Sequence, residues 1–173
     1  MNGGGVPQVD PLRRHGAFYR GYVRFLRTVP GRWVAINVAA PIDPFLMRVS
    51  GGRVGAGLVL PSLNLTSTGA RSGQPRTATV LYFSDGDDVI VIASSFGRDK
   101  HPAWYHNLKA HPDATLERGG RTGRYRATEV EDDAERERLF GLADLVYGGY
   151  ADYRERTAQV GRRIPILRLQ PVA

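Results

Sequence analysis

Residues 77–94, TATVLYFSDGDDVIVIAS, carry the clearest structural signal in this 173-residue chain. Residues 77–84 are rich in β-branched and aromatic side chains, which pack well on the pleated surface of a strand. Residues 89–94 are apolar at almost every position, as in a strand buried on both faces. The DGDD between them has the composition of a tight turn. The stretch therefore predicts an antiparallel hairpin whose second strand is fully buried.

Similar short strands are predicted on both sides of this hairpin. LVLPSLNLTST, residues 58–68, is extended, with leucines at alternating positions. ATLER (114–118) and RTGRYRATEV (121–130) flank a Gly-Gly pair and predict a second hairpin, and IPILRLQP (164–171) predicts a last strand. Five or six short antiparallel strands with only two inserted helices favour a mainly β, α+β fold built on a small barrel over a doubly wound sheet.

The two inserted helices have recognisable ends. Pro102 suits the first helical position and Pro112 stops the first helix. The second helix begins near Asp132 or Asp133, either of which can cap its first turn.

Composition limits the classes of function. The length suits one domain, and the absence of cysteine excludes disulfides and thiolate chemistry. No run approaches the roughly 20 apolar residues of a membrane span, and residues 1–10 do not resemble a secretory signal. We therefore expect a cytoplasmic protein.

The net charge of +7 is concentrated in the first third of the chain, where residues 1–60 hold eight arginines and two acidic residues. We divide the chain into an N-terminal basic helical segment, residues 1–54, and a barrel domain, residues 55–173. Residues 1–11 are rich in Gly and Pro and are expected to be disordered. A second short helical piece is expected around residues 33–39.

Residues 12–29 predict a basic amphipathic helix. Such a helix either packs on its own domain, which we favour, or lies on an anionic membrane surface at the inner face of the cell membrane. Nucleic acid is not an expected partner, because the basic charge is not interleaved with aromatic residues on the strands.

The segment TSTGARSGQPR, residues 66–76, joins two predicted strands and combines hydroxyls, glycines and arginines. Glycine turns and guanidinium groups suit a phosphate or carboxylate, whereas an ordinary turn with solvated arginines would have the same composition. Composition alone weighs these two interpretations about equally.

The segment SFGRDKHPAWYHNLKAHP, residues 95–112, places a loop of donors before an aromatic helix. Such an arrangement can form a wall for a flat anionic ligand. The spacing of Trp104 and Leu108 alone favours a helix anchored in the core. Histidines 101, 106 and 111 recur every five residues and cannot converge on one metal ion from a helix, so no metal site is expected.

The segment YGGYADY contains Tyr147, Tyr150 and Tyr153 at intervals of three, which would place the phenols on one side of a helix. Gly148 and Gly149 make a continuous helix doubtful and indicate a mobile lid. Phenols can stack on a flat substrate and donate a proton, although partly buried interface tyrosines are more common.

Together, TSTGARSGQPR, VIVIASSFGRDKHPAWYHNLKAHP, YGGYADY and IPILRL resemble the deazaflavin (F420)-dependent nitroreductase family, also described as F420H2-dependent quinone reductases. The resemblance covers roughly residues 55–170. It implies a split β-barrel of the FMN-binding, flavin reductase-like type and the cofactor F420, whose tail carries a phosphate and glutamates. It also implies hydride transfer to a flat electrophile such as a quinone or nitroaromatic.

The resemblance implies roles for individual residues. At the tail phosphate it implies Ala70, Arg71, Ser72 and Arg76; along the cofactor Thr77, Ala78, Thr79, Val80 and Leu81; at the ring Ser94 and Ser95, with Lys100 nearby; and on the opposite wall Ala103, Trp104, Tyr105 and Asn107. At the reacting end it implies Ser94, Tyr147, Tyr150 and Tyr153.

The chain departs from the family pattern where Ser95 and Phe96 replace a lysine and a glycine, and where ATV, residues 78–80, replaces NPL. The missing lysine weakens the anion site, and Phe96 narrows the pocket. The alternatives are the same barrel binding FMN or haem, and an F420 carrier without catalytic activity. The sequence does not indicate the oligomeric state or the physiological acceptor.

Overall fold

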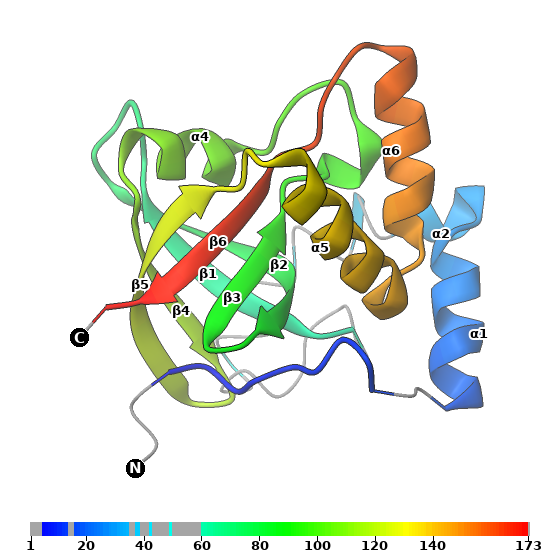
Figure 1. The fold of residues 1–173 in the computed structure, drawn as a ribbon, viewed down its shortest axis with the longest axis horizontal. Coiled ribbons are helices and arrows are strands. Elements are labelled where there is room, and N and C mark those ends of the chain that lie inside the picture. Colours follow the sequence, from blue (N-terminus) through cyan, green and yellow to red (C-terminus); the bar gives the residue numbers. More distant parts are fainter. Residues whose placement is uncertain are drawn as a thin grey trace.

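The computed structural model describes residues 5–13, 16–34, 37, 38, 42, 49 and 60–172. Within these ranges six antiparallel strands form a closed barrel in the order β1-β2-β3-β6-β5-β4 (Figure 1). The strands are Ser62–Thr68 (β1), Pro75–Asp85 (β2), Asp88–Ile92 (β3), Asp113–Arg118 (β4), Arg121–Glu129 (β5) and Ile166–Pro171 (β6). The predicted barrel and both predicted hairpins, β2–β3 and β4–β5, are confirmed.

The helices lie outside the barrel wall and over one of its ends (Figure 1). They are Ala17–Leu26 (α1), Val29–Val34 (α2), Ala103–Ala110 (α4), Asp133–Val146 (α5) and Gly149–Gln159 (α6), with a short 3-10 turn at Ser95–Gly97 (η2). None of the helices in the described ranges is both long enough and apolar enough to cross a membrane. The boundary expected between residues 54 and 55 falls outside the described residues, as do positions 35, 36 and 39 of the second expected helical piece.

Strand β3 is buried on both faces, as its sequence predicts. Val89 and Val91 point into the barrel, where they join the interior cluster. Ile90 and Ile92 point outward into a second cluster formed with α5, α6 and part of α1. Each such side chain stabilises the fold by about 1.5–3 kcal/mol. One strand therefore contributes to two hydrophobic layers.

The break between α5 and α6 falls at the glycine pair. Asp132 caps α5 by accepting a hydrogen bond from the backbone N–H of Glu135 at 2.8 Å, and α5 ends where Tyr147 adopts an extended backbone with φ −149° and ψ 99°. The expectation that Gly148 and Gly149 interrupt a helix is correct. Helix α6 itself has no clear signal in the sequence, because its 11 residues carry few apolar side chains.

Residues 5–10 are ordered against the barrel, which corrects the disorder expected for residues 1–11. The backbone N–H of Val6 donates to the Tyr125 hydroxyl at 3.1 Å, and the Tyr82 hydroxyl donates to the Pro7 carbonyl at 2.7 Å. Val6 is only 7% exposed. The Gly- and Pro-rich composition concealed these contacts, because their donors and acceptors lie on strands far along the chain.

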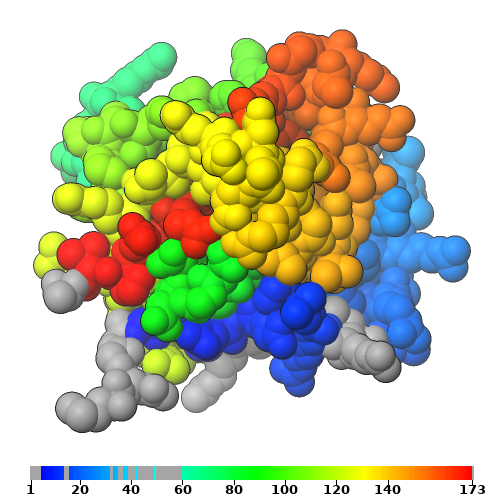
Figure 2. Space-filling model, in the orientation of Figure 1, coloured from blue at the N-terminus to red at the C-terminus, as the bar shows by residue number. Residues whose placement is uncertain are grey.

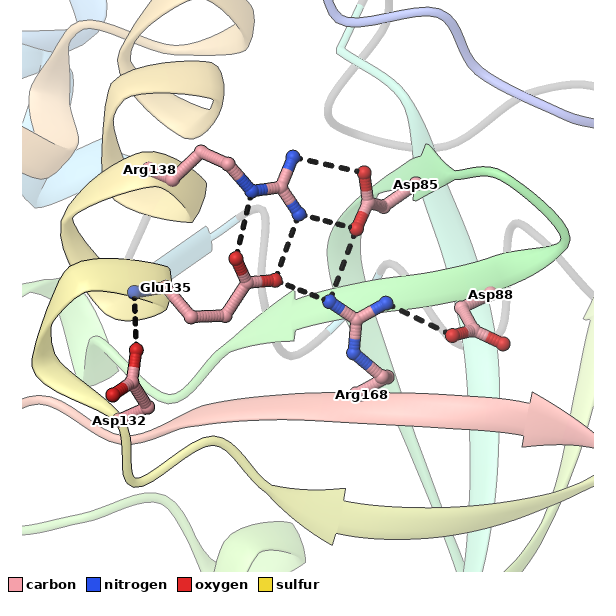
Figure 3. A network of polar contacts seen from close by, with 6 residues as sticks. All are labelled: Asp85, Asp88, Asp132, Glu135, Arg138 and Arg168. Atoms are coloured by element: carbon pink, nitrogen blue, oxygen red, sulfur yellow. Dashed lines mark hydrogen bonds and ion pairs between the residues drawn. The ribbon is translucent and has the colours of Figure 1, made fainter.

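A charged network fastens α5 to the β2–β3 hairpin and to β6 (Figure 3). Arg138 donates to Asp85 at 2.6 Å and to Glu135 at 2.7 Å. Arg168 bridges the same two carboxylates at 3.0 and 2.6 Å and also reaches Asp88 at 2.9 Å. Two guanidinium groups thus share three carboxylates, which holds the outer helix layer in register with the sheet.

Asp85→Asn is expected to lower the free energy of unfolding by about 1–2 kcal/mol at pH 7, because it weakens hydrogen bonds between charged groups. Hydrogen bonds from Arg138 lower the pKa of the Asp85 carboxyl. The carboxylate therefore stabilises the fold above its ordinary pKa, and this contribution is lost as the pH falls through the lowered folded-state pKa. In urea unfolding, the difference between wild type and variant should narrow below about pH 4.

Asp87→Asn is the matched control, because Asp87 is exposed at the tip of the same hairpin and makes no ion pair with any described residue. It should unfold like the wild type at every pH. A destabilisation by Asp85→Asn that is the same at pH 7 and pH 3 would contradict the proposed role of the network.

Candidate functional site

The loop between β1 and β2, residues 69–74, closes on itself. The backbone N–H of Gly69 donates to the Gln74 carbonyl at 2.9 Å, and that of Gly73 donates to the Gly69 carbonyl at 2.8 Å. Gly73 has φ +64°, a conformation that glycine adopts without strain. Arg71 and Arg76 are exposed at this loop, and neither forms an ion pair within the described ranges. Both guanidinium groups are therefore free to meet an anion.

Asn107 anchors this loop to α4. Its Oδ1 accepts a hydrogen bond from the Ala70 backbone N–H at 3.0 Å, and its Nδ2 donates to the Ser67 hydroxyl at 3.2 Å. The side chain is buried, so both polar ends are used inside the protein. Sequence reasoning grouped Asn107 with ligand-binding residues, whereas its contacts are those of a residue that holds the loop in place.

Alternation along β2 divides the expected cofactor residues 77–81 between two faces. Ala78 and Val80 pack in the barrel interior, so their side chains do not reach the outer surface. Thr77 and Thr79 face outward and form side-chain hydrogen bonds with β1. The hydroxyls of Thr77 and Thr66 are 2.9 Å apart, and the Thr79 hydroxyl donates to Asn64 at 3.0 Å. Leu81 also faces outward and packs on the outer cluster.

The loop after β3, which contains Ser94 and Ser95, has a strained backbone. Ser95 and Phe96 have φ of +51° and +56°, and Gly97 follows with +72°. A left-handed conformation costs a residue other than glycine roughly 1–2 kcal/mol, so other contacts must hold this turn.

Arg162 supplies those contacts. Its guanidinium donates to the carbonyls of Ala93 at 2.6 Å, Ser94 at 3.1 Å and Arg98 at 2.6 Å. It also donates to Nδ1 of His101 at 3.1 Å. Burial, and secondarily the charge of Arg162, lower the pKa of His101, which favours the neutral imidazole that this hydrogen bond requires. Sequence reasoning missed Arg162, because no motif surrounds it and its partners lie more than 60 positions earlier.

Helix α4 begins after Pro102, which is its N-cap, and ends before Pro112. Trp104 and Tyr105 are partly buried against the interior cluster. The Tyr105 hydroxyl donates to Glu129 at 3.0 Å, and burial followed by this hydrogen bond raises the pKa of the phenol. Ala103 and Lys100 are exposed at the start of the helix and in the preceding loop.

The structure brings Tyr147, Tyr150 and Tyr153 together, with each side chain only 5% exposed. The hydroxyls of Tyr147 and Tyr153 are 3.1 Å apart, and burial raises the pKa of Tyr150. A Cβ atom on Gly149 would lie 2.4 Å from the Tyr147 ring, so glycine is required for this packing.

This tyrosine cluster touches the strained loop. A Cβ atom on Gly97 would lie 3.1 Å from the Tyr153 ring, which shows how closely η2 and α6 approach. Direct contacts thus link the four parts in succession, from the β1–β2 loop through α4 and the Arg162-held loop to the tyrosine cluster. Among the described residues, no group of three His, Asp or Glu side chains is arranged to hold a metal ion.

Arg162→Met is expected to loosen residues 93–101 while the barrel stays folded. Three carbonyls lose a charged hydrogen-bond donor, and a hydrogen bond to a charged group contributes roughly 1.5–3 kcal/mol. Hydrogen–deuterium exchange at the backbone amides of Gly97 and Arg98 should become about tenfold faster or more. Arg163→Met is the control, since Arg163 is exposed and pairs with Asp133 instead. Equal exchange in the two variants would show that Arg162 does not hold the loop.

Comparison with known proteins extends over most of the chain. The model of the F420H(2)-dependent quinone reductase family matches residues 43–171. An F420H(2)-dependent quinone reductase of Mycobacterium tuberculosis strain H37Rv is 34% identical over 143 residues, which cover 79% of this chain and 94% of the relative.

The solved structures that are similar to this chain include the following two. An F420-H2 dependent reductase, FDR-A, is 33% identical with a TM-score of 0.57, covering 64% of this chain and 94% of that chain. A chain described as a domain-swapped dimer is 29% identical with a TM-score of 0.59, covering 82% of this chain and 99% of its own length. Residues 43–171, which the family model matches, include the barrel and the loops described above.

Proposed function

The chain belongs to the F420H(2)-dependent quinone reductase family, and on this premise we propose that it transfers a hydride from reduced F420 to a flat acceptor such as a quinone or nitroaromatic. The single observation that best supports the binding site is the β1–β2 loop, whose two arginines lack ion-pair partners among the described residues while Asn107 ties its backbone to α4. When bound, the reduced cofactor supplies the hydride. The protein supplies binding, orientation and donors.

The residues present fit the charged tail of the cofactor. Arg71 and Arg76 are exposed and can form charge-assisted hydrogen bonds with its phosphate. The loop around them is already closed by its own backbone hydrogen bonds, so little further ordering is needed on binding. Asn107 acts in this proposal as a positioning residue.

The residues present also fit a flat ring. Trp104 on α4 is partly exposed and offers an aromatic face. Ser94 and Ser95 lie on the loop held by Arg162, whose fixed backbone keeps their hydroxyls near one position. Phe96, in the same loop, packs against the outer cluster.

The donors at the reacting end are the hydroxyl of Ser94 and the phenols of Tyr147, Tyr150 and Tyr153. The Tyr150 phenol is protonated at neutral pH, because the ordinary pKa of a phenol is about 10 and burial raises that of Tyr150 further. A protonated phenol can donate to the acceptor oxygen on which negative charge develops. Because Tyr153 packs against Gly97, we expect α6 to move relative to η2 when an acceptor enters.

Fluorescence titration with purified F420 tests this proposal. Arg76→Ala and Trp104→Ala should each weaken binding about tenfold, since the first removes a charged hydrogen bond and the second removes a stacking surface. Arg121→Ala is the control, because Arg121 is an exposed arginine in the β4–β5 hairpin.

Oxidation of reduced F420 in the presence of menadione then separates an enzyme from a carrier. Tight F420 binding without acceptor-dependent oxidation would support the carrier, and a yellow flavin retained through purification would support FMN. Binding that is equal in wild type, Arg76→Ala and Trp104→Ala would reject the proposed site.

We also propose that the N-terminal helices contact a membrane surface. One face of α1 packs on the outer cluster through Leu26, Tyr19 and Tyr22, as expected for a helix packed on its own domain. Its other face and α2 expose large apolar side chains: Phe18 is 74% exposed and Trp33 is 60% exposed. Figure 2 shows these helices, in light blue, projecting from one side of the molecule.

The arrangement of exposed apolar and basic side chains supports an interfacial position for these helices. Arg13 and Arg24 are exposed in the same segment, and basic residues beside apolar ones favour an anionic lipid surface. A protein held there would meet quinones dissolved in the bilayer.

Phe18→Ser combined with Trp33→Ser is expected to reduce co-flotation with vesicles containing anionic lipid by about fivefold or more, because each substitution removes apolar area from the contact. Val172→Ser is the control, since Val172 is 44% exposed and directly follows β6, whose C-terminal end lies on the opposite side of the molecule from α1 and α2 (Figure 1). If the double variant floats as well as the control, the membrane proposal fails, and the enzyme proposal is unaffected.

A further inference from the structure

His101 connects the loop after β3 to the segment that follows α6. It lies at the end of that loop, directly before Pro102 and α4. Its ring nitrogen Nδ1 accepts a hydrogen bond from Nε of Arg162 at 3.1 Å, although Arg162 comes 61 positions later in the chain. The other two nitrogens of Arg162 donate to backbone carbonyls. Within the described ranges, the imidazole is therefore the one side chain that accepts a hydrogen bond from this guanidinium group.

This contact requires the neutral form of the imidazole. A ring nitrogen accepts a hydrogen bond only when it carries no proton, so the proton of the neutral ring must be on Nε2. When His101 is protonated, both ring nitrogens become donors, and two cations then face each other across the 3.1 Å that separates Nδ1 from Arg162. Protonation therefore replaces an attraction by a repulsion at the point where Arg162 is held.

Helix α4 and strand β5 place three titratable groups near the His101 ring. On α4, the centroid of the Tyr105 ring is 4.9 Å from that of His101, and the centroid of the His106 ring is 5.9 Å away. Glu129, at the end of β5, would attract a proton to His101. Its carboxylate already accepts hydrogen bonds from Tyr105 at 3.0 Å and from Lys109 at 3.1 Å.

The remaining charged groups lie on the loop itself and at Arg162. Arg98, Asp99 and Lys100 are exposed, and the negative charge of Asp99 acts on Arg162. Burial, followed by the positive charges of Arg162 and His106, lowers the pKa of His101, and Glu129 opposes this shift only weakly. The support that the neutral ring gives is therefore complete above about pH 6.5, and it is lost as the pH falls through the lowered folded-state pKa.

The backbone held by this pair is the strained turn that carries Ser94 and Ser95. The turn is closed by the backbone N–H of Gly97, which donates to the Ser94 carbonyl at 3.0 Å, and by that of Arg98, which donates to the Ser95 carbonyl at 3.1 Å. A strained backbone persists only while surrounding contacts over-determine it. If Arg162 shifts, the turn should relax and both serines should leave their positions.

We propose that neutral His101 is a positioning residue, which holds Arg162 against the loop that presents Ser94 and Ser95, and that its protonation releases this loop. The inference rests on the proposed function, because the position of the two serines affects the reaction only if they face the cofactor ring. It predicts that hydride transfer becomes less efficient at mildly acidic pH while the barrel stays folded.

Hydrogen–deuterium exchange tests the structural link without any cofactor. The amides of Gly97 and Arg98 close the turn, so their protection, corrected for the intrinsic effect of pH on exchange, reports its order. In the wild type, protection should fall about tenfold between about pH 8 and about pH 5, as expected for the loss of one hydrogen bond to a charged group. His101→Asn should remove this pH dependence, whatever its level of protection, because an amide oxygen accepts a hydrogen bond and does not titrate.

His111→Asn is the matched control. His111 is an exposed histidine directly after α4, and its side chain forms no hydrogen bond in the part of the chain that the structure describes. This variant should lose protection at acidic pH as the wild type does. Circular dichroism of all three proteins should show the same secondary structure at both pH values.

Reduction of menadione by reduced F420 tests the consequence for the reaction. The cofactor and the acceptor are the same for all three proteins, so their own titration cancels when the kcat/KM of a variant is divided by that of the wild type. For His101→Asn this ratio should rise about fivefold or more between about pH 8 and about pH 5. For His111→Asn it should stay constant.

The two measurements separate failure of this inference from failure of the proposed function. Wild-type protection that does not change with pH, or protection in His101→Asn that falls as in the wild type, would overturn the role of His101. A constant kcat/KM ratio for His101→Asn would also overturn it, because the loop would then not limit the reaction. If none of the three proteins oxidised reduced F420, the proposed function would fail, and the exchange measurement would still decide whether His101 holds the loop.

Discussion

The burial of β3 on both faces is the constraint on which the rest of the molecule depends. Its inward valines complete the barrel interior, and its outward isoleucines require a second covering layer. Helices α5, α6 and α1 supply that layer on one side. There Arg138 and Arg168 bind the same carboxylates, which fastens α5 to the sheet (Figure 3). The wall formed by β1, β4 and β5 has a polar outer row instead. The barrel is thus one-sided, with an apolar support on one wall and a polar surface on another.

The candidate site uses a buried amide and a partly buried guanidinium group to hold its loops, which leaves exposed cations free for a ligand. The Asn107 amide accepts a hydrogen bond from the Ala70 backbone N–H and donates one to the Ser67 hydroxyl. The Arg162 guanidinium donates to three backbone carbonyls and to an imidazole nitrogen. Because these donors and acceptors are used internally, the loops are set before a ligand arrives, which reduces the ordering cost of binding. The strained turn at Ser95 and Phe96 is compatible with this arrangement, because fixed contacts over-determine its backbone.

Much of the fold could be predicted because its signals are local. Alternation and turn composition identify both hairpins, Asp132 marks the start of α5, and the glycine pair marks its break from α6. The signals that failed depend on distant partners. Residues 5–10 are ordered by Tyr82, Ser84 and Tyr125, and α6 is short of apolar residues. Composition made the loop arginines candidates for anion binding, whereas Arg162 has no local signature and the family resemblance grouped Asn107 with ligand contacts.

The sequence by itself determined the strand order of the hairpins, the antiparallel class of the fold and the membership of its motifs in one family, since each depends on neighbouring residues or on whole motifs. Only the tertiary structure decided which polar side chains form hydrogen bonds inside the protein and which remain exposed for a ligand. It turned Ala78 and Val80 inward, closed the tyrosines on one another, and left Arg71 and Arg76 exposed. The physical reason is that a polar group forms a hydrogen bond with whichever donor or acceptor the fold brings within about 3 Å. Closure of the barrel brings together groups that are far apart in the chain.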